Sequence, residues 1–183
     1  MPQDSTAARY TPVAVAMHWL LALLIVSNFL FGLYMTSLEL SPTKLEYYNW
    51  HKWTGTTILG LSALRLLWRL GHRPPEDVAM PAWQRGLAHA THWALYALFF
   101  AVPLVGWAYS SAAGYPVVWF GVLPLPDFVS PDKALAQQIK PWHGRLAYTL
   151  AALVVLHMAG AAKHHWIDRD NLMSRMRLGR ASP

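Results

Sequence analysis

Four histidines within apolar segments have the residue type and spacing of metal ligands. His143 and His157 lie 14 residues apart on the last apolar segment, and His18 and His51 lie on two earlier ones. Along an α-helix this spacing spans about 21 Å, and it returns to within roughly 40° of the starting direction. Intramembrane histidines tend to mark function. The pattern therefore predicts two ligands at two depths, each with a partner on another helix, as in two stacked bis-histidine haems.

Depth in the bilayer predicts how the ligands pair. His51 and His143 each begin a segment on the same side, whereas His18 and His157 both lie nearer the other side. We therefore predict an outer pair, His51 with His143, and an inner pair, His18 with His157, as axial ligands of two haems b. His164 lies about 31 Å from His143 by helical rise, which places it at the interface, so His157 is the preferred ligand. Two neutral imidazoles saturate the iron for electron transfer.

Small residues beside the ligands make room for a porphyrin. Gly55 and Gly144 have this role in our interpretation. Gly32, Gly60 and Gly106 are assigned to packing between helices.

Two arginines end the second apolar segment and have two interpretations. Arg65 and Arg69 either snorkel toward the interface or contact haem propionates. The sequence leaves both open.

The histidines must be positioned by membrane-spanning helices. Hydrophobic residues make up 55% of the 183-residue chain and charged residues 13%, which favours the membrane class. Four stretches, near 13–35, 50–70, 87–109 and 142–166, have the roughly 20 residues needed to cross the hydrocarbon. No sequence repeat is apparent. We predict an all-α membrane protein: a four-transmembrane-helix bundle with two haems b in its core, forming a single domain over residues 1–183.

Charge predicts the orientation. Four spans place both termini on one side, and ten of the 15 lysines and arginines fall there, which favours cytoplasmic N- and C-termini. The net charge of +6 then reflects topology and contact with membrane lipid, with no nucleic acid as partner. The chain has no cysteine, which excludes cysteine-ligated iron–sulfur clusters and covalent c-type haem.

Several short motifs carry a family resemblance through their order and spacing. They are residues 17–20 (MHWL), 51–55 (HKWTG), 65–69 (RLLWR), 86–92 (GLAHATH), 140–143 (KPWH) and 162–166 (AKHHW). From about residue 9 to 177 the chain resembles the bacterial diheme cytochrome b561 family. The resemblance puts that family's haem ligands on His18, His51, His143 and His157.

The best-understood member of that family is a superoxide oxidase of the bacterial inner membrane. It passes electrons from superoxide on the periplasmic side through two haems to ubiquinone. The resemblance implies the same oxidoreductase activity for this multi-pass chain, with superoxide and ubiquinone as reactants and no required protein partner.

Residues around each haem suggest where the substrates bind. Lys52, Lys140 and Arg145 flank the outer ligands and could concentrate a small anion such as superoxide, although ordinary interfacial cations occupy the same positions. His164 and His92 lie toward the inner side and could donate hydrogen bonds and protons to a quinone. We place the quinone on the inner side, and the sequence leaves the outer side open.

Two other functions fit parts of the pattern. A cytochrome b subunit of a respiratory dehydrogenase or hydrogenase complex also carries four histidines on similar spans, but it needs a docking surface for its partner. A non-redox bundle could bind metal ions or protons for transport. Its usual intramembrane carboxylates are few here, because Glu39, Glu46 and Asp127 lie in or near connections.

Overall fold

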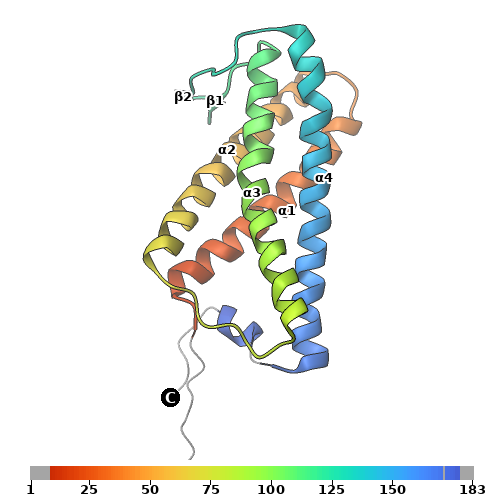
Figure 1. The fold of residues 1–183 in the computed structure, drawn as a ribbon. Helices are drawn as coiled ribbons and strands as arrows, with labels where there is room; N and C mark the ends of the chain where they lie inside the picture. The colour runs from red at the N-terminus through yellow and green to blue at the C-terminus, as the bar shows by residue number, and fades with distance from the viewer. Residues whose placement is uncertain (1–8, 171, 178–183) are drawn as a thin grey trace, which may run out of the picture.

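Four long helices build the protein, and a computed structural model describes residues 9–170 and 172–177 of it (Figure 1). A two-stranded antiparallel hairpin lies between the third and fourth helices, with Trp119 opposite Leu123. Two short helical turns follow the fourth. In chain order the elements are α1 (Pro12–Ser37), α2 (Pro42–Gly71), α3 (Ala82–Ala112), β1 (Val118–Trp119), β2 (Leu123–Pro124), α4 (Lys133–Lys163), the π-helix η1 (His164–Asp168) and the 3-10 helix η2 (Met173–Met176).

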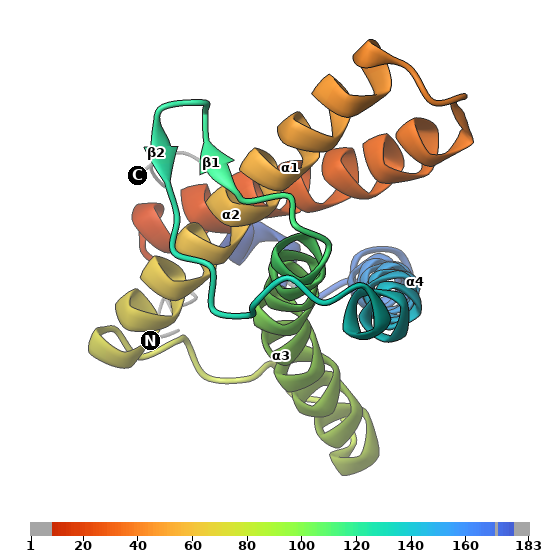
Figure 2. The same cartoon turned by 90° about the horizontal axis from the view of Figure 1, so that it is seen from above.

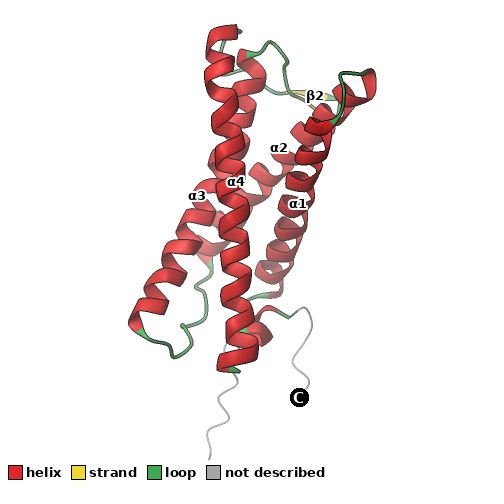
Figure 3. Ribbon diagram, turned by 90° about the vertical axis from the view of Figure 1, so that its right-hand side faces the viewer, coloured by secondary structure: helices red, strands yellow, loops and turns green. Residues whose placement is uncertain are grey.

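The helices pack as two antiparallel pairs. Figure 2 shows α1 running beside α2 and α3 beside α4, and α2 also packs against α3, whereas α1 and α4 touch little. The β1–β2 hairpin lies at one end of the bundle, and η1 and η2 lie at the other (Figures 1 and 3). We call these the hairpin end and the C-terminal end.

Polar caps set where the helices begin. The Thr11 side chain accepts a hydrogen bond from the backbone N–H of Ala14, and Ser41 accepts one from that of Lys44. In both helices proline follows the cap at the first position, where its fixed φ suits a helix and no N–H is needed. Ser41 and Pro42 therefore begin α2.

The four predicted helices are present, but all four start earlier than predicted. Helix α2 begins eight residues before residue 50, and α4 begins nine before residue 142. The difference arises because hydropathy marks only the apolar part of a helix, whereas caps and backbone hydrogen bonds extend it through polar residues. Helix α4 also continues through Pro141, and α3 through Pro103.

Three of the four helices are long and apolar enough to cross a membrane. Among the described residues these are Pro12–Ser37, Ala82–Ala112 and the continuous stretch Lys133–Asp168. Helix α2 falls short because it carries charged residues along its length: Lys44, Glu46, Lys52, Arg65 and Arg69. The prediction of membrane-spanning helices is thus confirmed for three helices, and the crossing by α2 stays a prediction.

An apolar cluster fills the middle of the bundle. It draws residues from all four helices: Leu21, Ile25, Ile58, Leu95, Leu98, Phe99 and Leu150. Leu150 stands halfway between His143 and His157 along α4. The cluster therefore separates two levels of polar residues, one toward each end of the bundle.

The cap of α4 gives a first prediction. Asp132 Oδ1 accepts hydrogen bonds from the backbone N–H groups of Ala134 (2.8 Å) and Leu135 (3.1 Å). We expect Asp132→Ala to lower the free energy of unfolding by about 1 kcal/mol, because two backbone donors lose their acceptor. Thermal unfolding in detergent measures this, with Asp132→Asn, which keeps an acceptor, as the control. Equal melting temperatures for the alanine variant and the unsubstituted protein would contradict it.

Candidate functional site

The outer histidine pair faces across the bundle from α2 to α4. The ring centroids of His51 and His143 lie 6.1 Å apart with their planes at 90°. Two imidazoles bound to one metal at about 2.0–2.1 Å per bond would place their centroids roughly 6.3 Å apart. His143 Nδ1–H donates to the backbone carbonyl of Val102 at 3.1 Å, which leaves Nε2 for a metal. The outer pair therefore has the separation and the donor atoms that haem iron requires.

Two glycines let these rings lie against the neighbouring helices. A Cβ atom on Gly106 of α3 would lie 2.8 Å from Cε1 of His143, and one on Gly32 of α1 would lie 3.2 Å from Cε1 of His51. Assigning these two glycines to helix packing alone was therefore incomplete, since each makes room for a histidine ring. Gly60, in contrast, has nothing within 4 Å of its Cβ position.

The inner pair repeats the outer separation. The ring centroids of His18 on α1 and His157 on α4 are 6.1 Å apart, with planes at 65°. A third histidine, His92 on α3, lies 5.3 Å from His157. That distance is too short for two imidazoles on opposite faces of one haem iron, so His18 is the better partner for His157. The structure thus brings together both pairs that depth in the sequence predicted.

The two helix pairs carry the same pattern, although we saw no repeat in the sequence. In α1 and α3 a His-Trp pair precedes a glycine: His18 and Gly32 match His92 and Gly106, offset by 74 residues. In α2 and α4 the offset is 92 residues, because the connection before α4 is longer than that before α2. Because the two offsets differ, aligning the chain with itself at one fixed offset does not reveal the match. In this second match Trp50, His51 and Arg65 correspond to Trp142, His143 and His157.

The pattern gives the inner level one polar residue from each helix. These are His18, Arg65, His92 and His157. Arg65 Nη2 lies 3.3 Å from His18 Nδ1. Sequence analysis placed Arg65 at the end of a span and did not predict this contact. The 14-residue spacing from His51 was the signal that could have found it.

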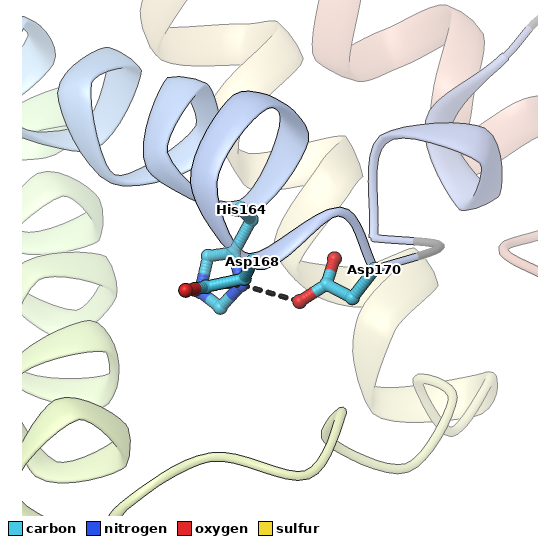
Figure 4. Close-up of side chains that lie close together, drawn as sticks. All are labelled: His164, Asp168 and Asp170. Carbon is cyan, nitrogen blue, oxygen red and sulfur yellow. Dashed lines mark hydrogen bonds and ion pairs between the residues drawn. The ribbon is translucent and has the colours of Figure 1, made fainter.

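The two predicted quinone contacts have different surroundings. His92 lies at the inner level, beside His157. His164 belongs to η1, where its Nδ1 lies 2.5 Å from Asp170 Oδ2 and 3.4 Å from Asp168 Oδ2 (Figure 4). Within the described part of the chain no hydrogen bond, ion pair or ring contact joins the two histidines.

The side chains around His164 already pair with one another. Their nitrogen and oxygen atoms lie within 4.8 Å of one another, close enough to bind a metal ion. Lys163 Nζ also lies 2.6 Å from Asp168 Oδ2. Because an ammonium and an imidazole already pair with the two carboxylates, the cluster holds the C-terminal segment against α4 without further ligands.

The predicted superoxide contacts lie at the hairpin end. Lys52 Nζ donates to the carbonyl of Pro116 at 3.2 Å. The guanidinium of Arg145 lies 5.1 Å from the ring centroid of Trp142. Lys140 lines a small open pocket between α3 and α4 together with Lys133. The three cations therefore surround the end of the bundle that carries the outer pair, and they form no ion pair within residues 9–170 and 172–177.

The hairpin itself is fixed to α2 beside His51. Trp53 Nε1–H donates to the carbonyl of Val118, and Trp119 Nε1–H donates to Thr57 Oγ1 at 3.2 Å. These bonds hold the long connection against α2 within two turns of His51.

Comparison with known proteins shows the family of this chain. The family model described as prokaryotic cytochrome b561 matches residues 9–179. The chain belongs to the prokaryotic cytochrome b561 family. It is accordingly a bacterial membrane protein that binds haem b and transfers electrons, which confirms the predicted family and haem type.

Curated members of the cytochrome b561 family match the chain over most of its length. "Cytochrome b561 homolog 2" of Escherichia coli (strain K12) is 34% identical over all of this chain and 97% of the relative. "Probable superoxide oxidase CybB" of Yersinia pestis is 31% identical, covering 92% of this chain and 95% of the relative. "Cytochrome b561 homolog 1" of E. coli is 29% identical, covering 92% and 96%.

The close approach of Gly106 to His143 gives a second prediction. We expect Gly106→Ala to reduce haem content, because the added methyl group would displace the ring that it contacts. The matched control is Gly60→Ala, whose methyl group meets no atom within 4 Å. Haem per chain is measured by pyridine haemochrome absorbance. Full haem content in Gly106→Ala would show that the ring position does not matter.

Proposed function

We propose that this cytochrome b561 holds two haems b and acts as a superoxide:ubiquinone oxidoreductase of the bacterial inner membrane. The observation that carries the proposal is the presence of two imidazole pairs, His51 with His143 and His18 with His157, both at 6.1 Å. The 31% identity to a probable superoxide oxidase supports the choice of substrate.

When bound, the two haems supply one-electron carriers at two depths of the bundle. The protein's own contribution is to fix the rings. Val102 orients His143 through its carbonyl, and Gly32 and Gly106 set how far the outer rings can move. The apolar cluster between the two levels keeps water out of the middle of the bundle.

Superoxide would react at the hairpin end. Each superoxide anion loses one electron and becomes dioxygen, so two are needed per quinone. Lys52, Lys140 and Arg145 supply positive potential there, which raises the local concentration of a small anion. None of these side chains has to form a bond with the substrate.

Ubiquinone would be reduced toward the C-terminal end. It takes up two electrons and two protons to become ubiquinol. His92 lies beside the inner ligand His157 and can donate a hydrogen bond or a proton at a quinone carbonyl. His164, with its two carboxylate partners, offers a site for proton entry at the same end.

The proposed orientation puts the hairpin end in the periplasm and both termini in the cytoplasm. Ten of the 15 lysines and arginines then face the cytoplasm. Helix α2 serves as the fourth span, because its polar residues face neighbouring helices as well as lipid. Arg65 of α2, for example, has its Nη2 3.3 Å from Nδ1 of His18 on α1.

The test of the proposed function combines haem counting with turnover. We expect two haems per purified chain, and one each in His157→Ala and His143→Ala, because each variant loses one axial ligand. Superoxide generated enzymatically should reduce a short-chain ubiquinone in proportion to the protein added, and added superoxide dismutase should abolish the reaction. A colourless chain would refute the haem site, and a two-haem chain without this turnover would refute the substrate.

The cations at the hairpin end give a further prediction. We expect Lys52→Gln, Lys140→Gln and Arg145→Gln together to slow superoxide oxidation at least about threefold at low ionic strength, and to weaken its dependence on salt. Arg73→Gln, Arg85→Gln and Arg169→Gln together are the matched control, because they remove three exposed charges from the opposite end of the bundle. An unchanged rate and salt slope in the triple variant would exclude electrostatic steering.

A further inference from the structure

We propose that Arg65, assisted by Arg69, binds the propionate carboxylates of the inner haem and thereby raises its reduction potential. This inference rests on the proposed two-haem site and adds a positioning role on α2, the helix that contributes no inner ligand.

The two arginines converge on one place between α2 and α3. They lie one turn apart on α2, and their guanidinium carbons lie 5.5 Å and 5.6 Å from the ring centroid of Tyr96 on α3. Arg65 also reaches His18, with Nη2 at 3.3 Å from Nδ1. Both positive groups are therefore gathered next to the inner level, and Arg65 directly contacts a proposed ligand.

The pair lacks a negative partner within the protein. Neither arginine forms an ion pair with a carboxylate in residues 9–170 and 172–177. Like charges one turn apart on a helix repel each other, and a charge inside a membrane bundle is costly unless it is paired. The two arginines therefore need an anion nearby to offset their charge. A guanidinium binds a planar carboxylate through two parallel hydrogen bonds.

An iron-bound His18 could not accept a hydrogen bond from Arg65. An imidazole that binds iron through Nε2 keeps its proton on Nδ1. Such a nitrogen donates a hydrogen bond and cannot accept one from a guanidinium. When His18 serves as a ligand, the donors of Arg65 must find another acceptor close by, and a propionate on the same haem supplies it.

The position of Arg65 in the helix pattern supports the same role. Arg65 follows His51 by the 14 residues that separate His143 from His157. This spacing returns to nearly the same face of the helix, so Arg65 points inward at the inner level as His157 does. Arg69 is more exposed than Arg65, and we therefore expect it to contribute less.

Reduction adds an electron to the iron, so nearby positive charge stabilises the reduced form. Removing Arg65 should lower the midpoint potential of the inner haem, whereas the outer haem should not change. A tenfold change in the equilibrium constant of a one-electron couple corresponds to about 59 mV.

The experiment is a potentiometric titration of haem absorbance in the full-length holoprotein. The component that disappears in His157→Ala is assigned to the inner haem. We expect Arg65→Gln to lower the potential of that component by the equivalent of roughly tenfold in its equilibrium constant, and Arg69→Gln to lower it less. Arg65→Lys keeps the charge and should hold the potential near that of the unsubstituted protein. Arg73→Gln, an exposed change of the same charge, is the matched control.

Loss of the inner haem alone in Arg65→Gln, with retention in Arg65→Lys, would also support the role, since the retained outer haem shows that the chain has folded. Unchanged potentials and haem content in Arg65→Gln would overturn it. Unchanged potentials together with a fall in copurifying phospholipid phosphate would also overturn the proposal, because the arginines would then bind a lipid headgroup. Fewer than two haems in the unsubstituted protein would instead refute the two-haem proposal on which this inference rests.

Discussion

The separation of paired imidazole rings is the constraint around which this bundle is organised. Both pairs stand at 6.1 Å, although one joins α2 to α4 and the other joins α1 to α4. Two imidazoles on opposite faces of one haem iron would have centroids roughly 6.3 Å apart. Helix α4 contributes a ring to each pair, so its course through the apolar cluster, with Leu150 midway, fixes the two levels relative to each other.

The outer and inner levels meet this constraint in different ways. At the outer level each ring is set by its surroundings: a glycine on the neighbouring helix lies against His51 and another against His143, and the latter also has a backbone acceptor. The inner level has polar side chains from all four helices. Two of them, Arg65 and His92, contact the proposed ligands His18 and His157. The outer level therefore mainly positions its two rings. The inner level also has side chains that can supply positive charge or donate protons.

The match between the helix pairs explains this difference. The first pair and the second pair share the His-Trp to glycine spacing and the spacing between two inward polar residues. At the inner level the second pair has a histidine, His157, where the first has an arginine, Arg65. One helix thus presents an imidazole, which can bind iron, and the corresponding helix presents a positive charge, which cannot.

The sequence by itself determined the class of protein, the four helices, the family and the pairing of the histidines. It could do so because hydropathy, helical rise and charge distribution act along one helix at a time. Local patterns also had limits. They placed the start of α2 after Ser41-Pro42 rather than at it, and the start of α4 after Pro141, since helix ends depend on caps that hydropathy does not detect.

Only the tertiary structure decided what lies between helices. It showed that Gly106 and Gly32 contact histidine rings, that Arg65 reaches His18 and that Trp53 fixes the hairpin over the outer level. These contacts join residues that are 19 to 65 positions apart. Their existence depends on how the helices are rotated and how closely they approach, which is set by packing of the whole bundle and not by any single segment.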